Sequence, residues 1–212
     1  MDPIKLICFD LDQTLITHSS WKELGLALGI SYEQDKRLFK EYESGITTYE
    51  QWNAKVLELY MKHPDANRER ITEILSRYSY AKGAREAIEY LKEKGYILVL
   101  ISGSIDILVD IVARDLGIKY AQANNALVFD EDGRLEGIHS LSEDEVFGKA
   151  EHLEAFSRML GIPLTQCACV ADGANDIEMF RRTGHGVTFK GSPIERQAWN
   201  VIDSFDDLRN IF

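Results

Sequence analysis

Polar side chains follow three short apolar runs of the chain, and most of them are carboxylates. The runs cover residues 4–9, 96–101 and 167–171. The polar residues that follow them are Asp10, Asp12, Ser102, Ser104, Asp172 and Asp176. Carboxylates gathered in one cleft repel each other, and their burial costs free energy unless a cation neutralises them. Mg²⁺ fits this need, because it binds carboxylate oxygens and keeps waters that phosphate oxygens can replace.

The elements that must position these side chains are buried strands separated by helices. The three runs lack the apolar–polar alternation of a half-exposed strand, which is typical of a parallel sheet covered on both faces. Helical patterns that end at a glycine separate them, over 84–94, 105–116 and 149–160. We therefore predict an α/β fold with a doubly wound, Rossmann-like parallel sheet. In such sheets ligands bind beyond the carboxyl ends of the strands, where these aspartates and serines would meet.

A long insert separates the first strand from the second. Residues 17–80 show apolar and aromatic side chains at helical spacing in four segments, with no strand signal between them. We predict a helical-bundle cap domain over 17–80, inserted into a core domain made of 1–16 and 81–212. A second, smaller interruption is predicted as a hairpin of 127–129 and 134–136.

Composition argues against several classes of function. The formal net charge is −11, and so acidic a surface repels nucleic-acid backbones and anionic lipid. No apolar run approaches the length of a membrane span, and the start of the chain lacks the layout of a secretory signal. The three cysteines fit a reducing compartment. We therefore expect a cytoplasmic protein without a nucleic-acid or membrane partner; the sequence indicates no particular oligomeric state.

The motifs of the chain resemble those of the haloacid dehalogenase (HAD) superfamily of phosphatases in order and spacing. Asp10-Leu11-Asp12-Gln13-Thr14 is similar to the DxDxT first motif, and Ser102-Gly103 is similar to the second. Lys149 resembles the third motif, and Asp172-Gly173-Ala174-Asn175-Asp176 resembles the fourth. The helical insert lies where this superfamily carries its helical cap. Among the branches of the superfamily, the chain is most similar to the phosphoserine phosphatases.

The resemblance implies hydrolysis of a phosphate monoester through an aspartyl-phosphate intermediate. Asp10 would be the nucleophile, and Asp12 would protonate the leaving oxygen and then activate water. The implied ligands of Mg²⁺ are Asp10, the backbone carbonyl of Asp12, and Asp172, with Asp176 as support. The implied ligands of the phosphoryl group are Ser102, Gly103, Lys149 and Asn175. Thr14 would orient the first loop. From the residues alone, Asn175 fits a helix cap as well as a phosphate ligand.

The chain departs from the phosphoserine phosphatases at the positions that recognise the amino acid. That branch supplies a glutamate shortly after the first motif and an arginine on a cap helix, where this chain has Ser19 and Val56, with Lys55 beside the latter. The two opposite charges of phosphoserine must both be paired in a closed cleft. We therefore expect an uncharged or singly charged organic phosphate, a small phosphorylated metabolite, to be preferred over phosphoserine. Trp21, Trp52 and Val56 would form an apolar or sugar-stacking wall that faces the phosphate.

Three alternative functions stay open at this level. The chain could be a true phosphoserine phosphatase of serine biosynthesis, or a phosphotransferase that passes the phosphoryl group to an alcohol. From another class, it could be a phospho-accepting switch or binding module. Asp12 and the cap argue against the switch, because a receiver-like domain needs neither a leaving-group acid nor a lid.

Overall fold

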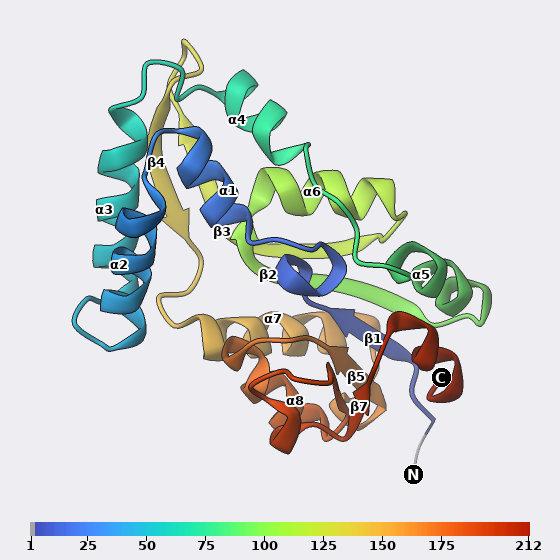
Figure 1. Ribbon diagram of the computed structural model, residues 1–212. Coiled ribbons are helices and arrows are strands. Elements are labelled where there is room, and N and C mark those ends of the chain that lie inside the picture. The colour runs from blue at the N-terminus through green and yellow to red at the C-terminus, as the bar shows by residue number, and fades with distance from the viewer. Residues whose placement is uncertain (1–2) are drawn as a thin grey trace.

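A seven-stranded sheet forms the centre of the molecule. The structure is a computed structural model, and it describes residues 3–212 (Figure 1). The order of strands in the sheet is β4-β3-β2-β1-β5-β6-β7. The strands are β1 (Leu6–Phe9), β2 (Ile97–Ile105), β3 (Tyr120–Phe129), β4 (Leu135–Ser140), β5 (Cys167–Val170), β6 (Gly186–Phe189) and β7 (Asn200–Ile202). Neighbours pair in parallel except β3 and β4, which are antiparallel. The predicted α/β class with a mostly parallel sheet is confirmed.

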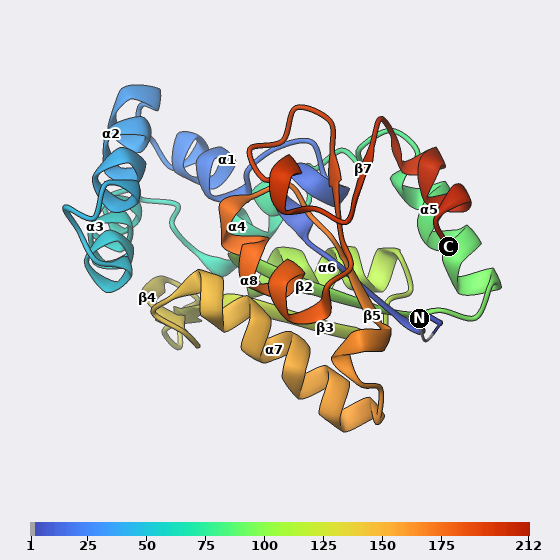
Figure 2. The same ribbon diagram turned by 90° about the horizontal axis from the view of Figure 1, so that it is seen from below.

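Helices α5 (Ala84–Glu93) and α6 (Asp106–Asp115) cover one face of this sheet, and α7 (Glu145–Leu160) and α8 (Ile177–Thr183) cover the other (Figures 1 and 2). The insert contains α1 (Ser20–Ala27), α2 (Tyr32–Glu43), α3 (Tyr49–Met61) and α4 (Arg68–Leu75). Side chains of α5 and α6 belong to one apolar cluster, and those of α7 and α8 belong to a second one. The two clusters divide the side chains of β1, because Ile7 and Phe9 belong to the first and Leu6 and Cys8 to the second. Burial on both faces explains why the strand sequences show no alternation.

Helices α1 to α4 lie between β1 and α5, as the periodicity of the insert predicts. The two segments that lead into and out of this insert pair with each other through an antiparallel bridge between Ile16 and Tyr80. The amide of Thr17 donates to the carbonyl of Ser79 at 3.0 Å, next to this bridge. The insert is therefore joined to the rest of the chain by two strand-like segments that run side by side.

The hairpin is larger than its sequence signal and belongs to the main sheet. It was predicted as a separate interruption, but β3 pairs with β2 over several residues, and β4 forms the sheet edge. The insert contacts this hairpin through Asn53 of α3, whose side-chain amide donates to Ser140 Oγ at 2.7 Å. The amide of Arg68 donates to the carbonyl of Gly133 at 2.8 Å. The hairpin therefore links the sheet to the helical insert.

Two further elements differ from the sequence prediction in ways that affect the site. Strand β2 continues through Ser102 to Ile105, with a register shift against β3 in this stretch. Helix α7 begins at Glu145 rather than at Lys149, because the side chain of Asp144 accepts a hydrogen bond from the amide of Phe147 and caps the helix. Lys149 therefore lies in the second turn of α7, and Glu145 lies in the first.

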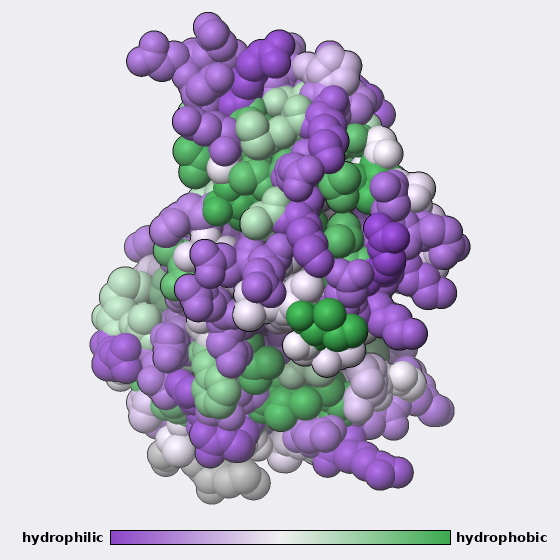
Figure 3. All heavy atoms as spheres, turned by 90° about the vertical axis from the view of Figure 1, so that its left-hand side faces the viewer, coloured by the Kyte–Doolittle hydropathy of each residue, from purple (hydrophilic) through white to green (hydrophobic). Residues whose placement is uncertain are grey.

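Strands β6 and β7 have no counterpart in the sequence prediction. They are short, and each pairs with its neighbour over only two or three residues. None of the helices in residues 3–212 has the length and apolar character that a membrane span needs. On the face over α2 and α3, hydrophobic side chains are interspersed with hydrophilic ones (Figure 3).

Candidate active site

The first motif forms a tight loop at the carboxyl end of β1. Asp10 follows the last residue of β1, and the chain then makes one wide turn, η1 (Leu11–Leu15), closed by a bond from the amide of Ile16 to the carbonyl of Leu11 at 3.0 Å. Gln13 has a φ of 59°, which lies in the left-handed region that few residues other than glycine adopt. This turn directs Asp10 and Thr14 back toward the end of β5, where the fourth motif begins.

Lys149 lies between two buried carboxylates. Its ammonium group donates to Asp10 Oδ1 at 2.7 Å and to Asp176 Oδ1 at 2.6 Å. Burial alone would lower the pKa of Lys149, but the charges of Asp10 and Asp176 outweigh it and raise that pKa. The lysine therefore stays charged, and a solvated surface position is excluded because only 1% of the residue is exposed.

The carboxylates at the ends of β1 and β5 gather in a cluster that is suited to a cation. Asp10, Asp172 and Asp176 each offer an oxygen within 4.8 Å of the others. Thr14 Oγ1 donates to Asp172 Oδ1 at 2.8 Å and lies 3.4 Å from Asp10 Oδ2. Burial and the charge of Asp10 raise the pKa of Asp172. The single positive charge of Lys149 does not balance the three carboxylates. Because all the available ligand atoms are oxygens, the cluster fits a hard divalent cation.

Asp12 points away from this cluster and toward the start of α1. Its Oδ2 accepts hydrogen bonds from the amide of Ser20 at 2.9 Å and from Ser20 Oγ at 2.6 Å. Ser20 Oγ is also 2.5 Å from Ser104 Oγ. Burial raises the pKa of Asp12 to about 7, although both bonds from Ser20 lower it. Asp12 Oδ1 is buried without a hydrogen-bond partner among the described residues.

The second and fourth motifs come together at the carboxylate of Glu145, in the first turn of α7. Ser102 is buried and its Oγ accepts from the amide of Ser104 at 3.1 Å. Gly103 lies against the carboxylate of Glu145, because a Cβ added at Gly103 would collide with Glu145 Oε1. The side-chain amide of Asn175 donates to Glu145 Oε2 at 3.4 Å. Asn175 therefore does not cap α8; its side chain faces the same space as Gly103.

Side chains of the insert make hydrogen bonds to the core around the space that Gly103, Asn175 and Glu145 border. The indole of Trp21 donates to the carbonyl of Gly103 at 3.1 Å. The hydroxyl of Tyr49 donates to Glu145 Oε1 at 3.0 Å and accepts from the side-chain amide of Asn125 at 2.7 Å. Together with the bonds from Ser20, these contacts hold the insert against the ends of the strands.

Sequence reasoning did not assign roles to Ser20, Tyr49, Asn125 or Glu145. A signal for Asn125 was present, since Asn124 and Asn125 interrupt an otherwise mostly apolar strand and both are buried. Glu145 carried no comparable signal, because the helix was predicted to begin four residues later. Ser20 and Tyr49 reach the site only through the packing of α1 and α3.

Ser19, Lys55 and Val56, at the positions expected to recognise phosphoserine, place no unpaired charge in the site. Val56 is buried in the same apolar cluster as Trp52. Lys55 pairs with Glu41 at 2.8 Å, and its side chain is 44% exposed. Trp52 packs edge-on against Trp21, with ring centroids 5.1 Å apart. Of the predicted wall, Trp52 and Val56 are therefore buried inside the insert. Trp21 is the residue of the three that contacts the second motif, through the carbonyl of Gly103.

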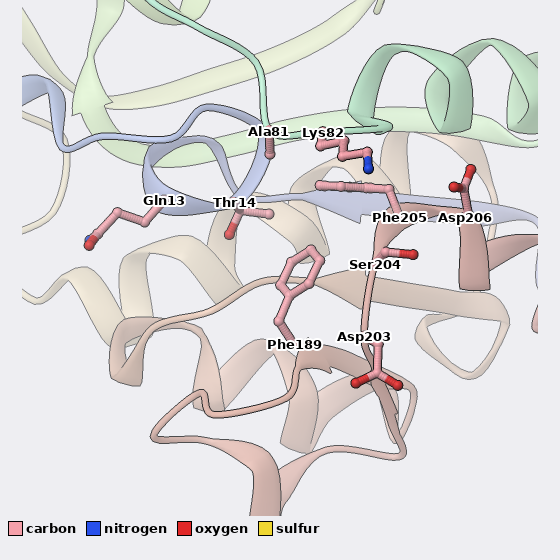
Figure 4. A pocket seen from close by; sticks show the side chains of 9 residues that line it. All are labelled: Gln13, Thr14, Ala81, Lys82, Phe189, Asp203, Ser204, Phe205 and Asp206. Carbon is pink, nitrogen blue, oxygen red and sulfur yellow. The ribbon is translucent and has the colours of Figure 1, made fainter.

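A pocket of about 450 Å³ lies next to Gln13 and Thr14 of η1 (Figure 4). It is lined by Gln13, Thr14, Ala81, Lys82, Phe189, Asp203, Ser204, Phe205 and Asp206. Thr14, which donates a hydrogen bond to Asp172 of the acidic cluster, also lines this pocket. The pocket therefore lies beside the candidate active site and contains none of its carboxylates.

Comparison with known proteins identifies relatives of the whole chain. The family model described as haloacid dehalogenase-like hydrolase matches residues 7–181. A phosphoserine phosphatase of Methanocaldococcus jannaschii is 35% identical over 210 residues, which cover 98% of this chain and 95% of that protein. A phosphoserine phosphatase of Wolinella succinogenes is 30% identical over 210 residues and covers 98% of both chains.

Solved structures agree with these relatives. A phospho-aspartyl intermediate analogue of phosphoserine phosphatase superposes with a TM-score of 0.83 at 32% identity, covering 99% of each chain. A substrate-bound phosphoserine phosphatase complex gives a TM-score of 0.82 at 33% identity, covering 100% of this chain and 98% of that one.

Proposed function

Because this chain belongs to the haloacid dehalogenase-like hydrolase family, we propose that it hydrolyses the phosphate monoester of a small molecule with Asp10 as the nucleophile. The chain is a phosphoserine phosphatase-like phosphatase, a phosphoric monoester hydrolase. The observation that carries the proposal is the buried group of Asp10, Lys149 and Asp176. Lys149, in the second turn of α7, donates at 2.7 Å to Asp10 after β1 and at 2.6 Å to Asp176 after β5. Such a group places a nucleophilic carboxylate beside a fixed positive charge.

The proposed reaction has two displacements at phosphorus. In the first, a carboxylate oxygen of Asp10 forms a bond to phosphorus while the bond from phosphorus to the ester oxygen breaks, and Asp12 gives its proton to the departing oxygen. In the second, Asp12 takes a proton from water, the water oxygen bonds to phosphorus, and the carboxylate of Asp10 is released. A pKa of about 7 for Asp12 suits a group that must act first as an acid and then as a base.

The remaining residues have proposed roles in binding. Ser102, the amide of Gly103, Asn175 and Lys149 would hold the other phosphoryl oxygens, and Thr14 would keep Asp172 and Asp10 in place. Asp10, Asp172 and the backbone carbonyl of Asp12 would bind Mg²⁺, with Asp176 in support. When bound, the metal would offset the repulsion between the phosphate and the carboxylates. Residues 17–80 are proposed as the cap that excludes bulk water from this reaction.

Phosphoserine is a second candidate substrate, favoured by the relative that is 35% identical over nearly its whole length. Against it, Val56 is buried among apolar residues and Lys55 pairs with Glu41, so neither position supplies a free cation for the carboxylate of the amino acid. We therefore propose that phosphoserine is not the preferred substrate.

The test is release of phosphate from p-nitrophenyl phosphate in the presence and absence of Mg²⁺. Asp10→Asn is expected to abolish release and to prevent labelling of the protein by a radioactive phosphate ester in rapid acid quench. Asp110→Asn, an exposed aspartate on α6, is the matched control and should keep both. Turnover by Asp10→Asn near that of the control would contradict the covalent role.

A further inference from the structure

The carboxylate of Glu145 lies at the junction of the insert, the second motif and the fourth motif. Its Oε1 accepts from the hydroxyl of Tyr49 at 3.0 Å, and its Oε2 accepts from the side-chain amide of Asn175 at 3.4 Å. The same carboxylate lies against the Cα of Gly103, where it leaves no room for a side chain. Glu145 therefore extends from the first turn of α7 into the space where the phosphate ester must bind.

This carboxylate has no ion-pair partner among the described residues. Its two hydrogen-bond donors, Tyr49 and Asn175, are neutral. The ammonium group of Lys149, one turn along α7, is already bonded to Asp10 and Asp176. Burial accordingly raises the pKa of Glu145, although Lys149 lowers it. A carboxylate held in this way is a binding site for a cation that the protein itself does not supply.

Binding of the substrate would increase this need for a positive charge. The phosphoryl group carries up to two negative charges, and Asn175 and Gly103 are among its proposed ligands. A second anion close to Glu145 raises the electrostatic cost unless the organic part of the substrate is cationic. A protonated amine a few bonds from the ester oxygen would offset the charge of Glu145 and that of the phosphate together.

The same surroundings disfavour a substrate that also carries a carboxylate. No hydrogen bond or ion pair of the described residues brings a lysine or arginine to Glu145, Tyr49, Asn125 or Gly103. A carboxylate of the substrate would meet the neutral amide of Asn125 and the hydroxyl of Tyr49, which carry no charge to balance it.

We propose that Glu145 binds a protonated amine of the substrate, and that the substrate is the phosphate monoester of an amino alcohol without a carboxylate. This inference rests on the proposed phosphatase activity and adds to it the chemical class of the substrate. Glu145 is a specificity-determining residue in this scheme, and it acts from the core helix α7 rather than from the insert.

The test compares three esters that differ by one charge at a time. 2-Aminoethyl phosphate and n-propyl phosphate have nearly the same size and differ by the ammonium group, while O-phosphoserine adds a carboxylate to the first. The wild-type protein is expected to favour 2-aminoethyl phosphate over each of the others by about tenfold or more in kcat/KM, as for a charge-assisted hydrogen bond. Glu145→Gln should bring the ratio of 2-aminoethyl to n-propyl phosphate close to one.

A matched control is Glu151→Gln, which removes an exposed carboxylate from the same helix and should leave the wild-type ratio unchanged. The wild-type comparison needs no variant, so it tests the inference even should Glu145→Gln not fold. Three results would overturn the inference while phosphatase activity stands. They are equal kcat/KM for 2-aminoethyl and n-propyl phosphate, a tenfold preference for phosphoserine, and an unchanged ratio of 2-aminoethyl to n-propyl phosphate in folded Glu145→Gln. Failure to hydrolyse any of the esters, p-nitrophenyl phosphate included, would overturn the proposed function and this inference with it.

Discussion

Replacement of Lys149 by methionine is expected to lower the stability of the fold much more than loss of a surface lysine would. The ammonium group is buried and makes two charge-assisted bonds, to Asp10 at 2.7 Å and to Asp176 at 2.6 Å. Methionine fills most of the space but leaves both carboxylates buried without their counter-ion. Removal of one partner from a buried ion pair costs about 3–5 kcal/mol.

This loss corresponds to a measurable change in melting temperature. For a chain of this length, 1 kcal/mol shifts the melting temperature by about 2–4 °C, so Lys149→Met should melt roughly 6–20 °C below the wild type at pH 8 in EDTA. The matched control is Lys55→Met, because Lys55 forms an exposed pair with Glu41. That pair should contribute no more than about 1 kcal/mol.

The dependence of the loss on pH provides an independent check. Burial raises the pKa of Asp176 even though Lys149 lowers it, so the variant should have a still higher folded-state pKa for this carboxyl. A raised folded-state pKa means that stability is retained at low pH and is lost as pH rises through that pKa. The difference between Lys149→Met and the wild type should therefore be smaller at pH 5 than at pH 8, and excess Mg²⁺ should restore part of it at pH 8.

Calorimetry or urea unfolding at both pH values measures these differences. A melting temperature for Lys149→Met within about 2 °C of the wild type at pH 8 would refute the reasoning, since it would correspond to a loss of at most about 1 kcal/mol. A loss of the same size at pH 5 and pH 8 would show that the effect comes from packing rather than from charge.

Four further predictions concern the reaction. Asp10→Asn should lower turnover by several orders of magnitude, because it removes the attacking carboxylate. Its melting temperature should fall much less than that of Lys149→Met, because Lys149 keeps Asp176 as its counter-ion and the repulsion between Asp10 and Asp172 is relieved; a loss as large as that of Lys149→Met would contradict this. Asp12→Asn should impair the hydrolysis of alkyl phosphates more than that of aryl phosphates, because an aryl oxide leaves without a proton; equal losses in kcat on the two would remove Asp12 from the acid role. For wild type, kcat/KM on an alkyl phosphate should fall above pH 7, where Asp12 loses the proton that the first step needs. Ser20→Ala removes a hydrogen bond that stabilises the charged form of the Asp12 carboxylate. The pH at which kcat/KM falls should therefore rise by about one unit in this variant. An unchanged pH dependence would show that Ser20 does not affect the pKa of Asp12.

Much of the fold could be predicted from local sequence. The runs before Asp10, Ser102 and Asp172 predict buried parallel strands because their side chains pack on both faces of the sheet. The periodicity of residues 17–80 predicts four helices, and four are present. Strands β6 and β7 could not be predicted, because their few residues gain their hydrogen bonds only from a sheet that is already formed.

The residue types at the ends of the strands can be read from the chain, because the strand ends and motifs are local features. Which of these side chains meet depends on how the helices and strands pack in three dimensions. Lys149 lies 139 positions from Asp10, and the two are joined only because α7 packs on the face of the sheet next to β1 and β5. Glu145, Tyr49 and Ser20 reach the site through the docking of helices on the strand ends. Contacts of this kind depend on the packing of whole elements, and no pattern within a single segment encodes them.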